Sequence, residues 1–218
     1  MKRAITLILI LATVSIMYSQ TDKKTSIKFL ALGDSYTIGE SVNEEDRWPV
    51  QLARMLRSKG FAIENPQIIA TTGWRTDQLK KAMDDARLKP EYALVSLSIG
   101  VNNQYQGKSP ESYAPEFEEL LKTAIILAGG KKENVFVVSI PDYGFTPFGQ
   151  PKQEEISKAL DEYNSINKRI AEKTGVQYVN ITDISRNGLA EPDLVADDKL
   201  HPSGKQYKLW VDRIVKLF

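Results

Sequence analysis

Five short apolar segments alternate along this chain with longer segments whose apolar residues recur at helical spacing. Apolar runs of this length, bounded by glycine or other turn residues, indicate strands buried on both faces. Strands that alternate with helices predict a parallel sheet covered by helices on both sides. We therefore expect an α/β fold, a three-layer α/β/α sandwich with a five-stranded parallel sheet, right-handed crossovers and flavodoxin-like topology. The strands are expected at 27–32, 66–71, 92–99, 135–140 and 177–180.

The intervening segments predict five helices. Each has a stop or start signal beside it, such as Gly60 after the first and Gly175 after the fourth. Pro115 predicts a break within the third helical segment. The helices are expected at 48–56, 76–86, 109–127, 153–173 and from 202 or 203 to 218.

The first twenty residues differ from the rest of the chain. Lys2 and Arg3 precede an apolar run at 4–14, and small or polar residues follow near Ser19. This pattern is typical of a secretory signal peptide, cut near 19–21, whereas a membrane anchor would need about 20 apolar residues. We therefore expect a signal peptide at 1–20 and a single domain at 21–218, located in the periplasm or outside the cell and without a permanent membrane anchor.

Composition limits the chemistry and the partners of the mature chain. There is no cysteine, which excludes disulfides, thiol catalysis, thiolate metal sites and a cysteine-linked lipid anchor. Removing Lys2 and Arg3 from the 29 basic residues leaves 27 against 28 acidic residues, a net charge of about −1. A balance this even offers no electrostatic attraction to nucleic acid or to an anionic membrane surface. A monomer is expected.

The first strand ends in Gly33-Asp34-Ser35. Sites in open parallel sheets form at the carboxyl ends of the strands, and a serine there would present its hydroxyl from rigid backbone, as a nucleophile requires. The tripeptide also suits an ordinary strand-to-helix turn in which aspartate or serine caps the helix.

His201 is the only histidine in the chain, and Asp198 precedes it by three residues. This spacing lets the carboxylate reach Nδ1 of the imidazole, which would leave Nε2 free to accept a serine proton. The competing interpretation is a helix-entry turn with a capping aspartate and an exposed histidine. Asp197 has a less usual spacing for the carboxylate role, and Asp183 and Asp193 are weaker candidates.

Two further strand ends carry hydrogen-bond donors. Gly73 follows the second strand and Asn102 follows the third. The N–H groups of Ser35 and Gly73 and the Asn102 side chain could together stabilise an oxyanion. Taken separately, Gly73 suits a turn and Asn102 a loop.

With these motifs the chain resembles the SGNH hydrolases, also called the GDSL lipase/esterase superfamily. The matching motifs are Gly33-Asp34-Ser35, Gly73, Gly100-Val101-Asn102 and Asp198-Lys199-Leu200-His201-Pro202, which run from the first strand to the last helix. The resemblance implies Ser35 as nucleophile, His201 as base, Asp198 as its partner, and an oxyanion hole of Ser35, Gly73 and Asn102, with no metal or organic cofactor. One position departs from the pattern, because Asn103 stands where the family usually has aspartate. We expect this change to alter loop packing rather than to abolish catalysis.

The predicted activity is hydrolysis of carboxylic esters through a Ser-His-Asp triad and an acyl-enzyme. Short acyl esters are favoured, including acetyl groups on carbohydrate, with lysophospholipid as a further candidate, because no long inserted segment could form a lid over a lipid-sized tunnel. Acyl transfer to a sugar hydroxyl shares the first half-reaction. Two non-hydrolytic hypotheses compete with these: a secreted carbohydrate-binding protein on a degenerate hydrolase scaffold, and a flavodoxin-like cofactor protein.

Overall fold

The computed structural model describes residues 26–218, and the signal peptide predicted at 1–20 lies outside them. Five strands form one all-parallel sheet in the order β2-β1-β3-β4-β5, which is the flavodoxin-like order. The predicted fold class is therefore confirmed. The strands are β1 (Phe29–Gly33), β2 (Gln67–Ala70), β3 (Leu94–Ser98), β4 (Val135–Val138) and β5 (Gln177–Val179).

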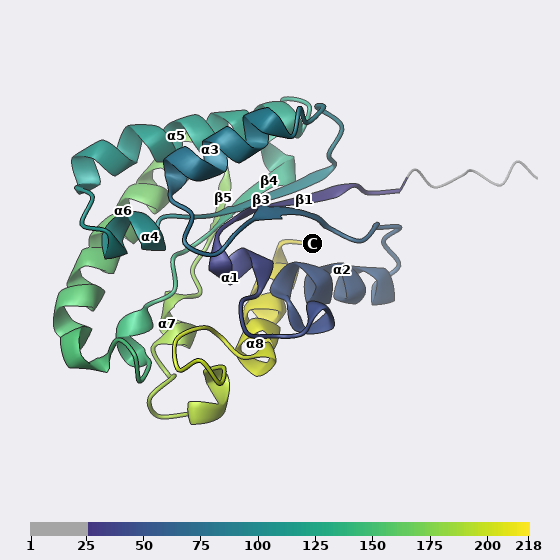
Figure 1. Cartoon of the computed structure of the whole chain (residues 1–218). Helices are drawn as coiled ribbons and strands as arrows, with labels where there is room; N and C mark the ends of the chain where they lie inside the picture. The colour runs from purple at the N-terminus through teal and green to yellow at the C-terminus, as the bar shows by residue number, and fades with distance from the viewer. Residues whose placement is uncertain (1–25) are drawn as a thin grey trace, which may run out of the picture.

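The longer helices cover both faces of this sheet. Figure 1 shows α3, α5 and α6 on one side and α2 and α8 on the other, so every residue of β1, β3 and β4 is buried. Trp48 of α2 packs edge-on against Phe136 of β4, and Trp210 of α8 is fully buried on the same side. These helices are α2 (Trp48–Ser58), α3 (Thr76–Asp85), α5 (Pro110–Leu127), α6 (Gln153–Thr174) and α8 (Gly204–Ile214).

The break predicted at Pro115 is wrong, because α5 continues through it as one helix. Pro115 is the sixth residue of α5, so the missing N–H leaves only the Glu111 carbonyl without its helical donor. Glu111 is exposed, and water can bond that carbonyl. Tyr113 and Phe117 on either side are fully buried, and their packing holds the helix together.

Short helices follow the carboxyl ends of three strands, where the sequence predicted only loops. These are α1 (Ser35–Ile38) after β1, α4 (Val101–Tyr105) after β3, and α7 (Thr182–Ser185) after β5. Segments this short have no periodicity to detect. The 3₁₀ turns are η1 (Glu44–Asp46), η2 (Lys132–Asn134), η3 (Tyr143–Phe145), η4 (Gln150–Lys152), η5 (Pro192–Leu194) and η6 (Val215–Leu217).

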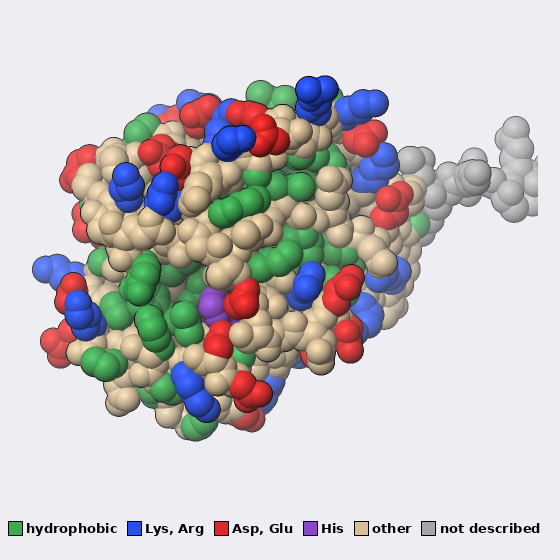
Figure 2. Space-filling model, in the orientation of Figure 1, with side chains coloured by type: hydrophobic (Ala, Val, Ile, Leu, Met, Phe, Trp, Pro, Cys, Tyr) green, Lys and Arg blue, Asp and Glu red, His purple; other side chains and the backbone are tan. Residues whose placement is uncertain are grey.

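The surface has one hollow of particular interest. Figure 2 shows the histidine side chain there, beside a group of hydrophobic side chains. Within residues 26–218, no helix combines the length and apolar character needed to cross a bilayer.

Candidate active site

Ser35 lies at the carboxyl end of β1, as the first residue of α1. The preceding Gly33 allows α1 and β3 to approach closely, because a Cβ there would lie 2.1 Å from Thr37 Oγ1 and 2.5 Å from the Ser98 carbonyl. Asp34 caps α1 by accepting a hydrogen bond of 3.0 Å from the Tyr36 N–H. The backbone on both sides of Ser35 is therefore held by the sheet and by the cap.

The Asp34 carboxyl is fully buried beside Ser35. Burial raises its pKa to about 7, although the Tyr36 N–H acts in the opposite direction. Asp34 does not line the pocket at Ser35 described below. Its role is to hold the turn, and we assign it no part in proton transfer.

His201 and Asp198 are joined as their spacing predicted. Asp198 Oδ2 lies 2.6 Å from His201 Nδ1. The other carboxylate oxygen, Oδ1, accepts the N–H groups of Leu200 and His201, each at 2.9 Å. The turn between them requires Lys199 to adopt a left-handed φ of 66°. One carboxylate thus holds both the turn and the ring.

Asp198 remains ionised over the whole ordinary pH range. Burial alone would raise the pKa of Asp198, but hydrogen bonds from Ser41 and His201 outweigh it and lower the pKa to about 2. An ionised carboxylate only accepts hydrogen bonds, so His201 Nδ1 carries the proton and Nε2 has a free lone pair.

Ser41 is a site residue that sequence reasoning missed. Its hydroxyl donates to Asp198 Oδ2 at 2.6 Å across 157 residues of sequence, from a left-handed position with φ 64°. No motif includes this serine, and its position relative to Asp198 depends on the packing of the loop after α1. By contrast, the competing carboxylates are engaged elsewhere, Asp183 with Arg213 and Asp193 with Lys205.

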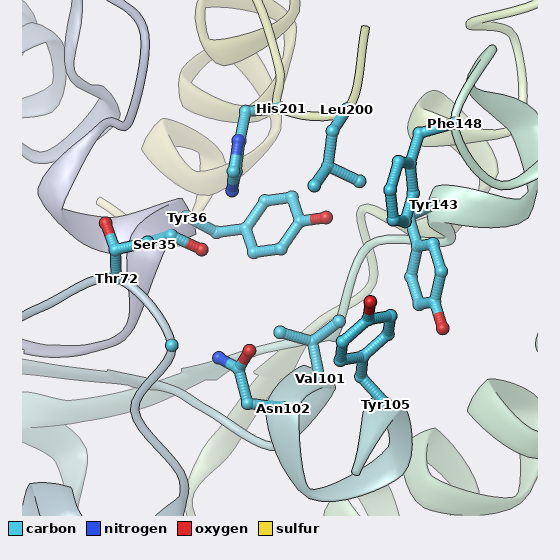
Figure 3. Close-up of a pocket in the computed structure, with 11 residues that line it drawn as sticks. Ser35, Tyr36, Thr72, Val101, Asn102, Tyr105, Tyr143, Phe148, Leu200 and His201 are labelled. Atoms are coloured by element: carbon cyan, nitrogen blue, oxygen red, sulfur yellow. The ribbon is translucent and has the colours of Figure 1, made fainter. Parts of the chain in front are cut away.

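Gly73 and Asn102 line the same pocket as Ser35. Figure 3 shows the Asn102 side chain in this pocket together with Ser35 and His201. Gly73 has a left-handed φ of 84°, and its N–H bonds to nothing within residues 26–218. Asn102, the second residue of α4, donates one amide hydrogen from Nδ2 to the Trp74 carbonyl at 3.0 Å. Its second amide hydrogen has no acceptor in the described part of the chain, so Gly73 and Asn102 each bring a hydrogen-bond donor to the pocket.

Asn103, which departs from the family pattern, is buried against the start of α3. Its Oδ1 accepts the Thr76 N–H at 3.1 Å, and its Nδ2 donates to the Thr76 hydroxyl at 2.7 Å. That hydroxyl in turn donates to the Glu116 carboxylate on α5. Asn102 and Asn103 therefore anchor the segment 71–76, which carries Gly73, at two successive points.

A pocket of about 170 Å³ opens at Ser35, and we call it the Ser35 pocket. Its walls are mostly apolar and aromatic, and the Tyr36 ring lies 5.1 Å from the His201 ring. The Ser35 hydroxyl makes no hydrogen bond to His201 in the described part of the chain, and such catalytic bonds often tighten only when substrate binds. The lining residues are Ser35, Tyr36, Thr72, Gly73, Val101, Asn102, Tyr105, Tyr143, Phe148, Leu200 and His201.

The described residues contain no group of three or more histidine, cysteine or acidic side chains that could hold a metal ion.

The fold of the chain is shared with known esterases. It aligns with a lipolytic protein of the G-D-S-L family from Veillonella parvula (TM-score 0.67, 16% identity, 88% of this chain and 98% of that one). It also aligns with the psychrotrophic esterase EstA from Pseudoalteromonas sp. (TM-score 0.62, 19% identity, 87% of this chain and 94% of that one). A third match is the acetylxylan esterase Axe2 from Geobacillus stearothermophilus (TM-score 0.67, 17% identity, 88% of this chain and 93% of that one).

No curated protein matches the sequence. The family model described as GDSL-like Lipase/Acylhydrolase matches residues 31–209, which include the serine turn, both oxyanion candidates and the Asp198–His201 pair. The chain therefore belongs to the GDSL-like lipase/acylhydrolase (SGNH hydrolase) family and is an esterase or acylhydrolase that acts on ester bonds.

Proposed function

We propose that this protein is an exported, monomeric serine esterase that hydrolyses short acyl esters. The observation that carries the proposal is the arrangement of His201, held through Nδ1 by the ionised Asp198, in the same small pocket as Ser35. Export rests on the basic start and apolar run at 1–14, and the mature protein should begin near residue 21.

In the proposed reaction, His201 Nε2 takes the proton of the Ser35 hydroxyl while Oγ bonds to the ester carbonyl carbon. The tetrahedral intermediate collapses by breaking the bond to the alcohol oxygen, which leaves with the proton from Nε2. Water then gives a proton to Nε2 as its oxygen bonds to the acyl carbon. The bond from that carbon to Ser35 Oγ breaks, Oγ takes the proton back from Nε2, and the acid is released. The Asp198 carboxylate stabilises the imidazolium in both half-reactions.

The negative oxygen of each intermediate is assigned to the N–H groups of Ser35 and Gly73 and to the free amide hydrogen of Asn102. Each such donor typically accounts for about 10²–10³ in rate. The hydrogen bond from Asn102 to Trp74 fixes the amide before substrate arrives, so it need not reorganise during the reaction.

Asn103 and Glu116 form a matched pair around Thr76. The single Thr76 hydroxyl proton goes to Glu116, so residue 103 must donate to the hydroxyl oxygen. An aspartate at 103 has no hydrogen to donate, so its carboxylate would compete with Glu116 for the Thr76 hydroxyl proton. We expect Asn103→Asp to lower the free energy of unfolding by about 1–2 kcal/mol and kcat several-fold, because a buried carboxylate oxygen loses its donor.

A double-mutant cycle tests this pairing. Glu116→Gln alone is the matched control and should be nearly neutral, because a glutamine oxygen still accepts the Thr76 proton. In Asn103→Asp/Glu116→Gln the glutamine amide can donate instead, and stability and kcat should recover. Additive losses, measured by urea unfolding and ester hydrolysis, would contradict the pairing.

The preference for short acyl chains is inferred from the size of the Ser35 pocket. At about 170 Å³ it is smaller than the roughly 300–1,000 Å³ typical of sites for larger ligands, and it ends at a wall of aromatic rings. With p-nitrophenyl acetate, butyrate and octanoate, we expect kcat/KM to fall at least about tenfold between butyrate and octanoate. A preference for octanoate would instead favour lysophospholipid-type substrates.

A further inference from the structure

A second pocket of about 430 Å³ adjoins the Ser35 pocket. Tyr105, Tyr143 and Phe148 line both, so these three rings form a shared aromatic wall. The remaining lining residues come from α4 and the turn after it, from η4 and the residue before it, and from the start of α6. They are Gln104, Gly107, Gly149, Pro151, Lys152, Glu155 and Ile156.

The aromatic wall consists of one buried ring, Tyr143, and two exposed rings, Tyr105 and Phe148. Tyr143 is buried, and its hydroxyl donates to Gln104 Oε1 at 3.0 Å. Tyr105 and Phe148 pack against it with ring centroids 6.1 and 6.4 Å away, yet they are 60% and 48% exposed. Large aromatic rings left this open beside a pocket are suited to stacking against a ligand.

The second pocket lies on the leaving-group side of the proposed reaction. The alcohol oxygen must face His201 to receive its proton. From His201 the wall of the Ser35 pocket continues through Leu200 to Phe148 (Figure 3), whose N–H bonds the Lys199 carbonyl at 3.1 Å. Because Phe148 lines both pockets, an alcohol group that extends from His201 along Leu200 and Phe148 would enter the second pocket.

The chemistry of the second pocket favours a neutral polyhydroxylated ligand over a hydrocarbon chain. Lys152 and Glu155 contribute one charge of each sign, and neither forms an ion pair within the described residues. Together with Gln104 they offer donors and acceptors to hydroxyl groups. An alkyl chain would leave these polar groups desolvated without partners.

We propose that the second pocket binds the alcohol half of the ester, and that this alcohol is a neutral carbohydrate whose ring stacks on Phe148 or Tyr105. This inference rests on the proposed function, since it needs Ser35 and His201 in their assigned roles. The acyl group, an acetyl or similar short chain, occupies the Ser35 pocket. The enzyme would then select its substrate mainly through the alcohol.

The test compares acetylated xylo-oligosaccharide with ethyl acetate, whose alcohol is too small to reach the second pocket. The variants are Phe148→Ala and Lys152→Ala/Glu155→Ala. We expect each to lower the ratio of kcat/KM for the sugar ester to kcat/KM for ethyl acetate roughly 5- to 10-fold, mainly through KM. Glu154→Ala/Lys158→Ala changes the same charges at exposed positions of α6 outside the pocket and should keep the wild-type ratio.

The outcomes separate the two proposals. If wild type hydrolyses ethyl acetate but neither variant changes the ratio, the alcohol subsite is wrong while the esterase proposal stands. If the variants instead impair ethyl octanoate relative to ethyl acetate, the pocket binds acyl chains and the carbohydrate assignment is overturned. If wild type hydrolyses none of these esters, the proposed function itself fails.

Discussion

Ser35→Ala is expected to lower kcat for p-nitrophenyl acetate on the order of 10⁴-fold or more, because the side chain assigned as nucleophile loses its oxygen. The change removes one atom at the start of α1. The cap from Asp34 to the Tyr36 N–H does not involve the lost hydroxyl, so α1 should be retained. The rate of p-nitrophenyl acetate hydrolysis is measured for wild type and Ser35→Ala, and thermal unfolding of both proteins checks that the variant is folded.

Ser58→Ala is the matched control. Ser58 is exposed at the end of α2, where its hydroxyl donates to the Met55 carbonyl and to no other group within residues 26–218, and its loss should leave the rate unchanged. Equal rates in wild type and Ser35→Ala would remove Ser35 from the mechanism and favour a carbohydrate-binding protein on a hydrolase scaffold.

Asp198→Asn is expected to lower kcat on the order of 10⁴-fold while the fold is kept. Two backbone N–H groups, of Leu200 and His201, require an acceptor at the Oδ1 position. The asparagine oxygen must therefore stay there, which turns its NH₂ group towards His201 Nδ1. Nδ1 then accepts rather than donates, the proton moves to Nε2, and Nε2 can no longer take the proton of Ser35.

This effect should be separable from simple loss of a charge. Asp197→Asn removes an exposed neighbouring carboxylate and should keep most of the activity. The ring proton of Asp198→Asn can be located by ¹⁵N NMR of His201, and we expect it on Nε2. A variant that retains wild-type kcat, or that keeps the proton on Nδ1, would remove Asp198 from the proposed role.

The predicted fold needed only local patterns. Each strand is an apolar run that ends at a turn residue, and each long helix has an apolar stripe, so the order of the elements implied a parallel sheet. The predicted break at Pro115 is wrong because the buried packing of Tyr113 and Phe117 outweighs the loss of one helical hydrogen bond.

The sequence by itself determined the fold class, the family motifs and the pairing of Asp198 with His201, because each depends on residues close together in the chain. Only the tertiary structure brought Ser41 to Asp198 across 157 residues and Asn103 to Thr76 across 27 residues. It also decided the two pockets and their shared aromatic wall, which joins rings from α4, η3 and the loop before η4. Such contacts depend on how distant segments pack, and no spacing along the chain encodes them.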